Sequence, residues 1–377
     1  MSVYLDHNAT TRARPAAIVA MTQVLESVGN PSSVHAAGRR AHAALEAARA
    51  EVAALIGAPA STLVFTSGGT EANALAIGSA VAAGARRLIV SAVEHDSVLE
   101  TARASGAAVE PLPVDSQGAA DLDWLGARLA RWDAADGRPF VALMLANNET
   151  GVLQPVAEAA ALVRAADGWL HVDAVQAAGK VAIDSRALGA DTLSVSAHKI
   201  GGAQGVGALT FGPRAALTRL QHGGGQERGR RGGTENLPGA VGFGAAARAA
   251  GEGLDAFGRQ AAWRDAAAAR LAAAGARVIG ERAPRLPNTL CLTSPGFSAE
   301  LQVMALDLAG VMISAGAACS SGKVKASHVL TAMGEPDAAC AIRVSGGWDT
   351  TEADWNRFAE AWLEARAGHA ARRKEIA

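Results

Sequence analysis

The sequence is poor in cysteine, balanced in charge and without an apolar run of membrane-spanning length. Its three cysteines, Cys291, Cys319 and Cys340, have no paired spacing, which argues against a disulfide framework and a structural zinc site. The 36 acidic and 35 basic side chains nearly cancel, so neither nucleic acid nor a membrane surface is an expected partner. The first residues lack the basic and apolar regions of a signal peptide, and we therefore expect a cytoplasmic protein.

The pattern of apolar residues predicts an α/β fold of two domains. The chain has 377 residues, half of them hydrophobic, and short runs of Val, Ile and Leu alternate with Ala-rich stretches, as in a mostly parallel sheet flanked by helices. The expected strands are 63–65, 87–93, 140–146, 169–172, 192–195 and 207–211, with helices over 36–56, 71–83 and 155–166. A long helix over 237–276 should lead to a smaller α+β region, with a strand at 289–292 and helices at 299–308 and from 351 onward.

Polar residues follow five of the expected strands at their carboxyl ends. Open α/β sheets bind ligands at that edge, so one ligand can contact all five clusters. Each cluster alone has a structural explanation, as a turn, a helix cap or a satisfied histidine, and the prediction of a site depends on their shared position. The clusters are Thr66–Thr70, Glu94-His95, Asn147–Glu149, Asp173–Gln176 and Ser196–Lys199.

One part of these clusters suits a phosphate group. Gly69 and Thr70 directly precede the helix expected over 71–83, where backbone N–H groups, a hydroxyl and the positive end of the helix dipole favour an anion. Ser196 and His198 can add side-chain donors. Together these four residues predict a phosphate site.

The remaining residues suit a flat ring that carries an aldehyde. Asp173 can hold a protonated ring nitrogen, Gln176 and Asn148 can bind ring or substrate oxygens, and His95 can stack on the ring. Lys199 supplies an amine for a Schiff base. A nucleotide site is the alternative, but the sequence has no Gly-x-x-x-x-Gly-Lys-Ser/Thr loop, and its glycines follow the lysine instead of preceding it.

Eight segments, in order between about residue 4 and about residue 350, resemble the cysteine desulfurases of the NifS/IscS type. The resemblance implies a class V aminotransferase with the type I fold of pyridoxal 5'-phosphate enzymes, working as a homodimer. It further implies a large cofactor domain over 16–254 and a small domain, made of 1–15 with 255–377, that carries the catalytic cysteine loop. The segments are Leu5–Thr11, Gly29–His35, Phe65–Glu71, Asn147–Gly151, His171–Gln176, Ser196–Lys199, Gly224–Gly229 and Gly232–Asn236.

The resemblance also implies roles for single residues. Lys199 forms the Schiff base, Asp173 pairs with the ring nitrogen, Gln176 contacts the ring hydroxyl, and His95 stacks on the ring and is a candidate for proton transfer. Asn148 faces cofactor and substrate, and Arg343 clamps the substrate carboxylate through two hydrogen bonds. The phosphate is bound by Gly69, Thr70, Ser196 and His198, with Thr234 reaching in from the other subunit.

Cys319 is the expected nucleophile. It lies in a stretch of small residues that indicates a mobile loop, and a free thiol with a pKa of about 8.5 needs exposure and a nearby base to react. Cys291 and Cys340 lie in apolar or Ala-rich segments and are expected to be small buried residues. No resident metal is expected, and the one metal role considered is a transient iron–sulfur handover at Cys319.

The expected reaction removes sulfur from L-cysteine, giving L-alanine and a Cys319 persulfide for a sulfur acceptor such as an iron–sulfur scaffold. In it Lys199, freed by the substrate, takes the Cα proton before the Cys319 thiolate attacks the sulfur. A selenocysteine lyase or another class V enzyme is an alternative, and so is a non-catalytic scaffold relative. The scaffold predicts loss of Lys199, Asp173 or His95, and all three are present.

Overall fold

The larger part of the chain is built on a seven-stranded sheet with the order β2-β8-β7-β6-β5-β3-β4. A computed structural model describes residues 2–315 and 327–376, so Cys319 lies outside the described residues. β8 is antiparallel to both of its neighbours and all other pairs are parallel, so six strands share one direction. The strands are β2 (Leu63–Thr66), β3 (Arg87–Ser91), β4 (Ala108–Leu112), β5 (Phe140–Ala142), β6 (Trp169–Asp173), β7 (Thr192–Ser196) and β8 (Gly207–Phe211).

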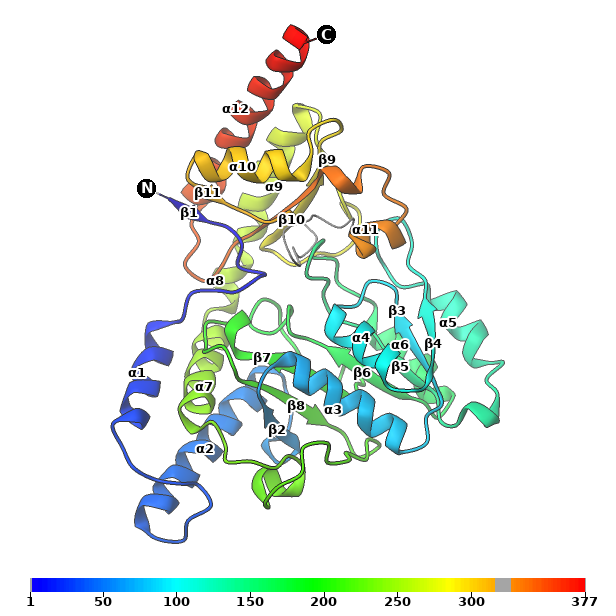
Figure 1. Ribbon diagram of the computed structural model, residues 1–377, viewed down its shortest axis with the longest axis vertical. Helices are drawn as coiled ribbons and strands as arrows, with labels where there is room; N and C mark the ends of the chain where they lie inside the picture. Colours follow the sequence, from blue (N-terminus) through cyan, green and yellow to red (C-terminus); the bar gives the residue numbers. More distant parts are fainter. Residues whose placement is uncertain (1, 316–326, 377) are drawn as a thin grey trace.

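Helices cover both faces of this sheet, as Figure 1 shows. The central strands β5, β6 and β7 are buried along their whole length, as expected of parallel strands between two helical layers. The helices are α1 (Pro15–Leu25), α2 (Ala36–Leu55), α3 (Gly69–Ala82), α4 (Asp96–Ala104), α5 (Leu122–Leu129), α6 (Val156–Ala165) and α7 (Leu237–Glu252). A mostly parallel sheet with flanking helices was predicted, and the structure confirms it.

Small residues let α2 and α7 approach each other closely. A Cβ atom on Gly244 of α7 would lie 2.7 Å from the Cα of Ala48 in α2, a distance that no larger side chain tolerates. The Ala-rich composition of these helices therefore has a packing role besides its favourable helix propensity.

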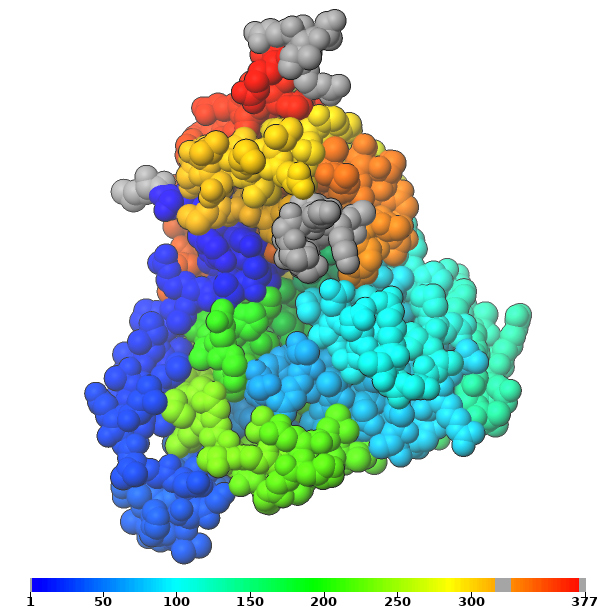
Figure 2. Space-filling view, viewed as in Figure 1, coloured from blue at the N-terminus to red at the C-terminus, as the bar shows by residue number. Residues whose placement is uncertain are grey.

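The C-terminal part and the first residues of the chain form a small body with its own hydrophobic core, which includes Leu5, Leu271, Leu306, Phe358 and Trp362. Its two sheets have the orders β12-β10-β9 and β1-β11, and the second of these joins the N-terminal strand to the C-terminal part. Figure 2 shows the N-terminal residues, in dark blue, running from this small body at the top to the larger part below it, which holds the seven-stranded sheet. The domain boundaries given above stay a prediction. The elements are β1 (Val3–Tyr4), β9 (Arg277–Val278), β10 (Thr289–Thr293), β11 (Val311–Met312), β12 (Ala341–Ser345), α8 (Leu254–Gly258), α9 (Gln260–Ala273), α10 (Ala299–Leu308), α11 (His328–Ala332) and α12 (Glu352–Ile376).

Some predicted elements differ from the structure. The single helix expected over 237–276 is three helices, α7, α8 and α9, broken at Gly253 and Arg259, because the glycines in this stretch lower its helix propensity. The strand expected over 140–146 ends at Ala142. Strand β4 was missed because it is a largely exposed edge strand that contains Pro111 and has little apolar signal. Over residues 2–315 and 327–376, no helix has the length and apolar character to cross a membrane.

Candidate active site

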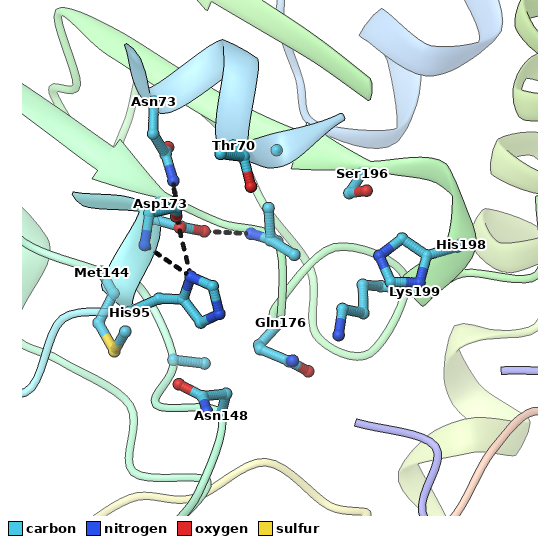
Figure 3. Close-up of a pocket in the computed structure, with 14 residues that line it drawn as sticks. Thr70, Asn73, His95, Met144, Asn148, Asp173, Gln176, Ser196, His198 and Lys199 are labelled. Carbon is cyan, nitrogen blue, oxygen red and sulfur yellow. Dashed lines mark hydrogen bonds between the residues drawn. The ribbon is translucent and has the colours of Figure 1, made fainter. Parts of the chain in front are cut away.

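A cavity of about 210 Å³ lies at the carboxyl ends of β2, β3, β5, β6 and β7. All five predicted polar clusters contribute to it, which confirms that they meet at one edge of the sheet (Figure 3). Thr234 and Arg343 do not line it. The residues that do are Gly69, Thr70, Asn73, His95, Ser97, Met144, Ala146, Asn148, Asp173, Val175, Gln176, Ser196, His198 and Lys199.

One wall of the cavity is the first turn of α3. No side chain among the described residues caps this helix at Gly68, so its first N–H groups are available to an anion. Gly69 fits closely against the opposite wall, since a Cβ atom there would lie 2.8 Å from Cγ2 of Val175. Glu71 holds the turn, because its carboxylate accepts from the Ser67 N–H at 2.7 Å and pairs with Arg231 at 2.9 Å.

Asp173 ends β6 with its carboxylate at the cavity wall and is only 7% exposed. Oδ1 accepts from the Val175 N–H at 2.9 Å and Oδ2 from Asn73 Nδ2 at 2.8 Å. Asn73 is itself oriented, because its Oδ1 accepts from Ser194 Oγ at 2.6 Å and contacts His171 Nε2 at 3.0 Å. Burial lowers the pKa of His171 to about 3, so this histidine is neutral.

His95 caps α4 and turns its second ring nitrogen toward the cavity (Figure 3). Its Nδ1 accepts from the Ser97 N–H at 3.0 Å, so a neutral His95 has its proton on Nε2. Ser97 also accepts from Asn73 Nδ2 at 2.9 Å, which links His95 to the residue that holds Asp173. The neighbouring Glu94 is fully buried, and burial together with the charge of Asp173 raises its pKa well above the usual value.

Lys199 projects toward the cavity from the turn after β7. Its Nζ donates to the backbone carbonyls of Asn8 at 2.5 Å and Ala9 at 2.7 Å. Burial, with Arg343 as a neighbouring cation, lowers the pKa of Lys199 to about 8. Burial and Lys199 likewise lower the pKa of His198 to about 4, which leaves His198 a neutral ring beside the lysine.

Arg343 and Thr234 lie outside the cavity. Arg343, in β12, is tied to Asp6 and to the backbone of Asn148, a residue that does line the cavity. Thr234 is exposed and lies in a separate hollow with Thr66, Ser67 and Glu235.

Sequence reasoning missed Asn73, Ser97 and Met144, which line the cavity. It also missed Asn8 and Lys180, which contact residues that line it. Asn8 and Asn73 are at most 1% exposed and Lys180 is 5% exposed, and each contacts a predicted site residue. The available signal was polar residues at buried positions, since Asn73 lies one helical turn after Gly69 and Lys180 one turn after Gln176.

The two described cysteines are both free, but only Cys291 is buried as expected. Its thiol is fully enclosed, and burial raises its pKa so far that it has no useful thiolate fraction. Cys340 is partly exposed, which corrects the prediction of a buried residue, because it ends a short 3-10 helix, Ala338–Cys340, in which no residue is buried. Over the described ranges, no cluster of His, Cys, Asp and Glu could hold a metal ion.

Comparison with known proteins shows likeness along nearly the whole chain. The family model "Aminotransferase class-V" matches residues 3–358. A cysteine desulfurase of Cereibacter sphaeroides is 45% identical over 368 residues, which cover 95% of this chain and 94% of that protein. A NifS-like protein from Rickettsia africae ESF-5 has a TM-score of 0.87 at 32% identity, covering 97% of this chain and 99% of that one. SspA, solved in complex with cysteine, has a TM-score of 0.77 at 29% identity, covering 91% and 98%.

Proposed function

This chain belongs to the cysteine desulfurases of the class-V aminotransferase family, and we propose that it uses pyridoxal 5'-phosphate to take sulfur from L-cysteine and place it on Cys319. The observation that carries the cofactor assignment is that Lys199, Asp173 and the first turn of α3 line one cavity. Three groups of the cofactor have a suitable partner here. The amine suits its aldehyde, the buried carboxylate suits its ring nitrogen, and the uncapped helix N-terminus suits its phosphate.

The hydrogen bonds of Asp173 and the lowered pKa of Lys199 support the assignment. Both Asp173 oxygens have donors from the protein, and carboxylate oxygens keep lone pairs for one more donor such as a ring N–H. Because burial lowers the pKa of Lys199 to about 8, more of its amine is neutral at neutral pH than in an ordinary lysine. Gly69, Thr70, Ser196 and His198 are the residues assigned to the phosphate.

Bound pyridoxal phosphate supplies an electron sink for the carbon from which the proton leaves. We assign Lys199 Nζ to accept the Cα proton of cysteine and to hold it for return. His95 has Nε2 toward the cavity, where it can exchange a proton with bound substrate. Asn148 and Arg343 are assigned to the substrate, with Arg343 as the partner of its carboxylate.

Cys319 is the sulfur acceptor in this proposal. Its thiolate attacks the substrate sulfur, so that an S–S bond forms while the C–S bond breaks and its electron pair stays with the carbon fragment, which leaves as L-alanine after protonation. Cys291 cannot take this role because its thiol is enclosed in the core. The persulfide then passes to an acceptor protein, for which an iron–sulfur scaffold is the chemical expectation.

We also propose that the enzyme is a cytoplasmic homodimer. Several apolar side chains on and after α1 are exposed, among them Leu25 at 68%, Val28 at 83% and Val34 at 89%, and a stable chain normally covers such a surface. The exposed Thr234 lies outside its own cavity, as a residue serving a neighbouring subunit would. A reducing compartment suits an enzyme that depends on a free thiolate.

The decisive experiment incubates the purified protein with L-cysteine and measures L-alanine and sulfide. Cys319→Ala should lose sulfur transfer while keeping the visible absorbance of bound cofactor, and Lys199→Ala should lose both. Cys340→Ala is the matched control and should behave as the wild type does. Sulfur release by Cys319→Ala at the wild-type rate would exclude the persulfide route, and unchanged visible absorbance in Lys199→Ala would exclude Lys199 as the Schiff-base residue.

A further inference from the structure

Lys180 is a buried lysine next to the cavity that forms no ion pair with an acidic side chain of the described residues. It is 5% exposed, and its Nζ donates to Gln176 Oε1 and to Asn8 Oδ1, both at 2.8 Å. Burial, with Lys199 and Arg343 as neighbouring cations, lowers the pKa of Lys180 well below its usual value. An apolar side chain would be less costly at such a position, so the two contacts of Lys180 point to a role beyond packing.

The first contact orients the amide of Gln176. A lysine amine donates hydrogen bonds to both oxygens in either protonation state, so Gln176 turns Oε1 toward Lys180 and Nε2 away from it. Nε2 donates one hydrogen to the Asn8 carbonyl at 2.9 Å. Its second hydrogen is available to a ligand, because Gln176 lines the cavity.

The second contact holds Asn8 in place. With Oδ1 facing Lys180, the Asn8 side chain turns Nδ2 to the carbonyl of Asn148 at 3.1 Å and to Thr289 Oγ1 at 3.0 Å. The backbone carbonyl of the same residue accepts from Lys199 Nζ at 2.5 Å. Lys180 therefore fixes both a cavity amide and the carbonyl on which the reactive lysine rests.

We propose that Lys180 is a positioning residue, which acts through Gln176 and Asn8 to present an N–H donor to the ring hydroxyl of the cofactor. The proposal rests on the pyridoxal phosphate assignment made above. Lys180 itself does not line the cavity and is not expected to touch substrate or cofactor. The effect of replacing Lys180 on cofactor binding should therefore depend on the presence of Gln176. The effect of replacing a purely structural residue would not.

The test is a double-mutant cycle on cofactor binding by the full-length apoprotein. Lys180→Met keeps the length of the side chain and removes its donors, and we expect it to weaken pyridoxal phosphate binding about tenfold, the effect of one lost hydrogen bond. In a Gln176→Leu background the same change should cost less than about twofold. The pH midpoint of the visible absorbance should rise in both single variants, because Gln176→Leu removes the donor to the ring hydroxyl oxygen and Lys180→Met no longer holds that donor in place.

Gln302→Leu is the control for general destabilisation. Gln302 is a fully buried amide of the small body that bonds to Phe297, Cys340 and Trp362, away from the cavity. It should lower thermal stability and leave the affinity for pyridoxal phosphate unchanged. Wild-type affinity in Lys180→Met, or the same loss with and without Gln176, would refute the positioning role. If the wild type itself binds no pyridoxal phosphate, the proposed function fails instead.

Folding failure of Lys180→Met would also be informative. That variant leaves Gln176 Oε1 without a donor from the described residues, while Asn8 Oδ1 keeps Asn288 Nδ2 at 3.4 Å. The Lys180→Met/Gln176→Leu double variant removes the unpaired oxygen. We then expect the double variant to be the more stable of the two. A double variant as unstable as Lys180→Met would contradict the coupling.

Discussion

Arg343 and Asp6 form an ion pair in which Arg343 Nη2 lies 2.6 Å from Asp6 Oδ1. Arg343 also donates through Nη1 to the Asn148 carbonyl at 3.2 Å, and its Nε has no hydrogen-bond partner among the described residues. The pair joins β12 of the small body to the N-terminal segment and to a loop of the cavity. A guanidinium held in this way is pre-oriented for a carboxylate, which lowers the entropy lost on binding.

Replacing Arg343 should impair substrate binding more than turnover. For Arg343→Gln we expect the KM for L-cysteine to rise about 30-fold, because hydrogen bonds between charged partners contribute about 2 kcal/mol. Steady-state assays of alanine formation measure the effect on KM and kcat separately. Arg277→Gln is the control, since Arg277 pairs with Asp337 on the half-exposed surface of the small body and should leave KM unchanged. A wild-type KM in Arg343→Gln would remove this residue from the substrate site.

The rate at which the apoprotein takes up pyridoxal phosphate should depend on the protonation of Lys199. Burial lowers the pKa of this amine to about 8, and only the neutral amine attacks an aldehyde. The rate should therefore rise with pH and level off above about pH 8. With an ordinary lysine the rate would keep rising to about pH 10.4. Stopped-flow absorbance over a pH series measures the midpoint.

Two neighbours should move this midpoint in opposite directions. The positive charge of Arg343 lowers the pKa of Lys199 and the negative charge of Asp6 raises it. Arg343→Gln should consequently shift the midpoint upward and Asp6→Asn downward. Shifts in the same direction would show that conformational change, and not charge, governs the amine.

Glu94 should make the protein less stable as pH rises. Burial and the charge of Asp173 raise its pKa in the folded state well above the usual value. The contribution of Glu94 to the free energy of unfolding is therefore present below the unfolded-state pKa of about 4.3 and is lost as pH rises through the folded-state pKa. Glu94→Gln cannot ionise and should keep the acceptor oxygen for the Met144 N–H. The free energy of unfolding of this variant, relative to wild type, should increase from about pH 5 to about pH 8.

Denaturant unfolding at each pH measures that difference. Glu364→Gln, an exposed site on α12, is the control and should show no such trend. A constant difference between Glu94→Gln and wild type would mean that Glu94 does not change its ionisation on folding.

The cavity was predictable because each of its walls is a local pattern. A buried strand followed at once by polar residues, as at β6 and Asp173, places a side chain at a known edge whatever the rest of the chain does. The role of Asn73 was not predictable, because it holds Asp173 from 100 positions away in the sequence. Lys180 and Asn8 lie 172 positions apart, and only the folded chain shows that they meet.

Helix breaks and edge strands were the weak points of the fold prediction. Ala-rich sequence continues through Gly253 with no change of hydrophobic pattern, so the turn between α7 and α8 depends on glycine content and on tertiary packing. β4 is held by its pairing with β3 and not by burial of its own side chains. Periodicity identifies elements that are buried, and these elements give too little of that signal.

Thr234 should complete the site of the partner subunit, and mixed dimers can test this directly. Thr234→Val should weaken pyridoxal phosphate binding about tenfold through loss of a hydrogen bond to phosphate, and Lys199→Ala should show no visible absorbance. In a dimer with one subunit of each kind, the Thr234→Val subunit keeps Lys199 and receives Thr234 from its partner. That site should therefore bind pyridoxal phosphate with wild-type affinity and give half of the wild-type absorbance.

The reciprocal dimer pairs a wild-type subunit with a Lys199→Ala/Thr234→Val subunit. Its one site with Lys199 receives valine from the partner, so its affinity should fall about tenfold, to the level of the Thr234→Val homodimer. If Thr234 acts within its own subunit, the two results exchange: the first dimer binds weakly and the reciprocal dimer binds as the wild type does. Purification through two different affinity tags isolates each mixed dimer, and absorbance titration gives its affinity.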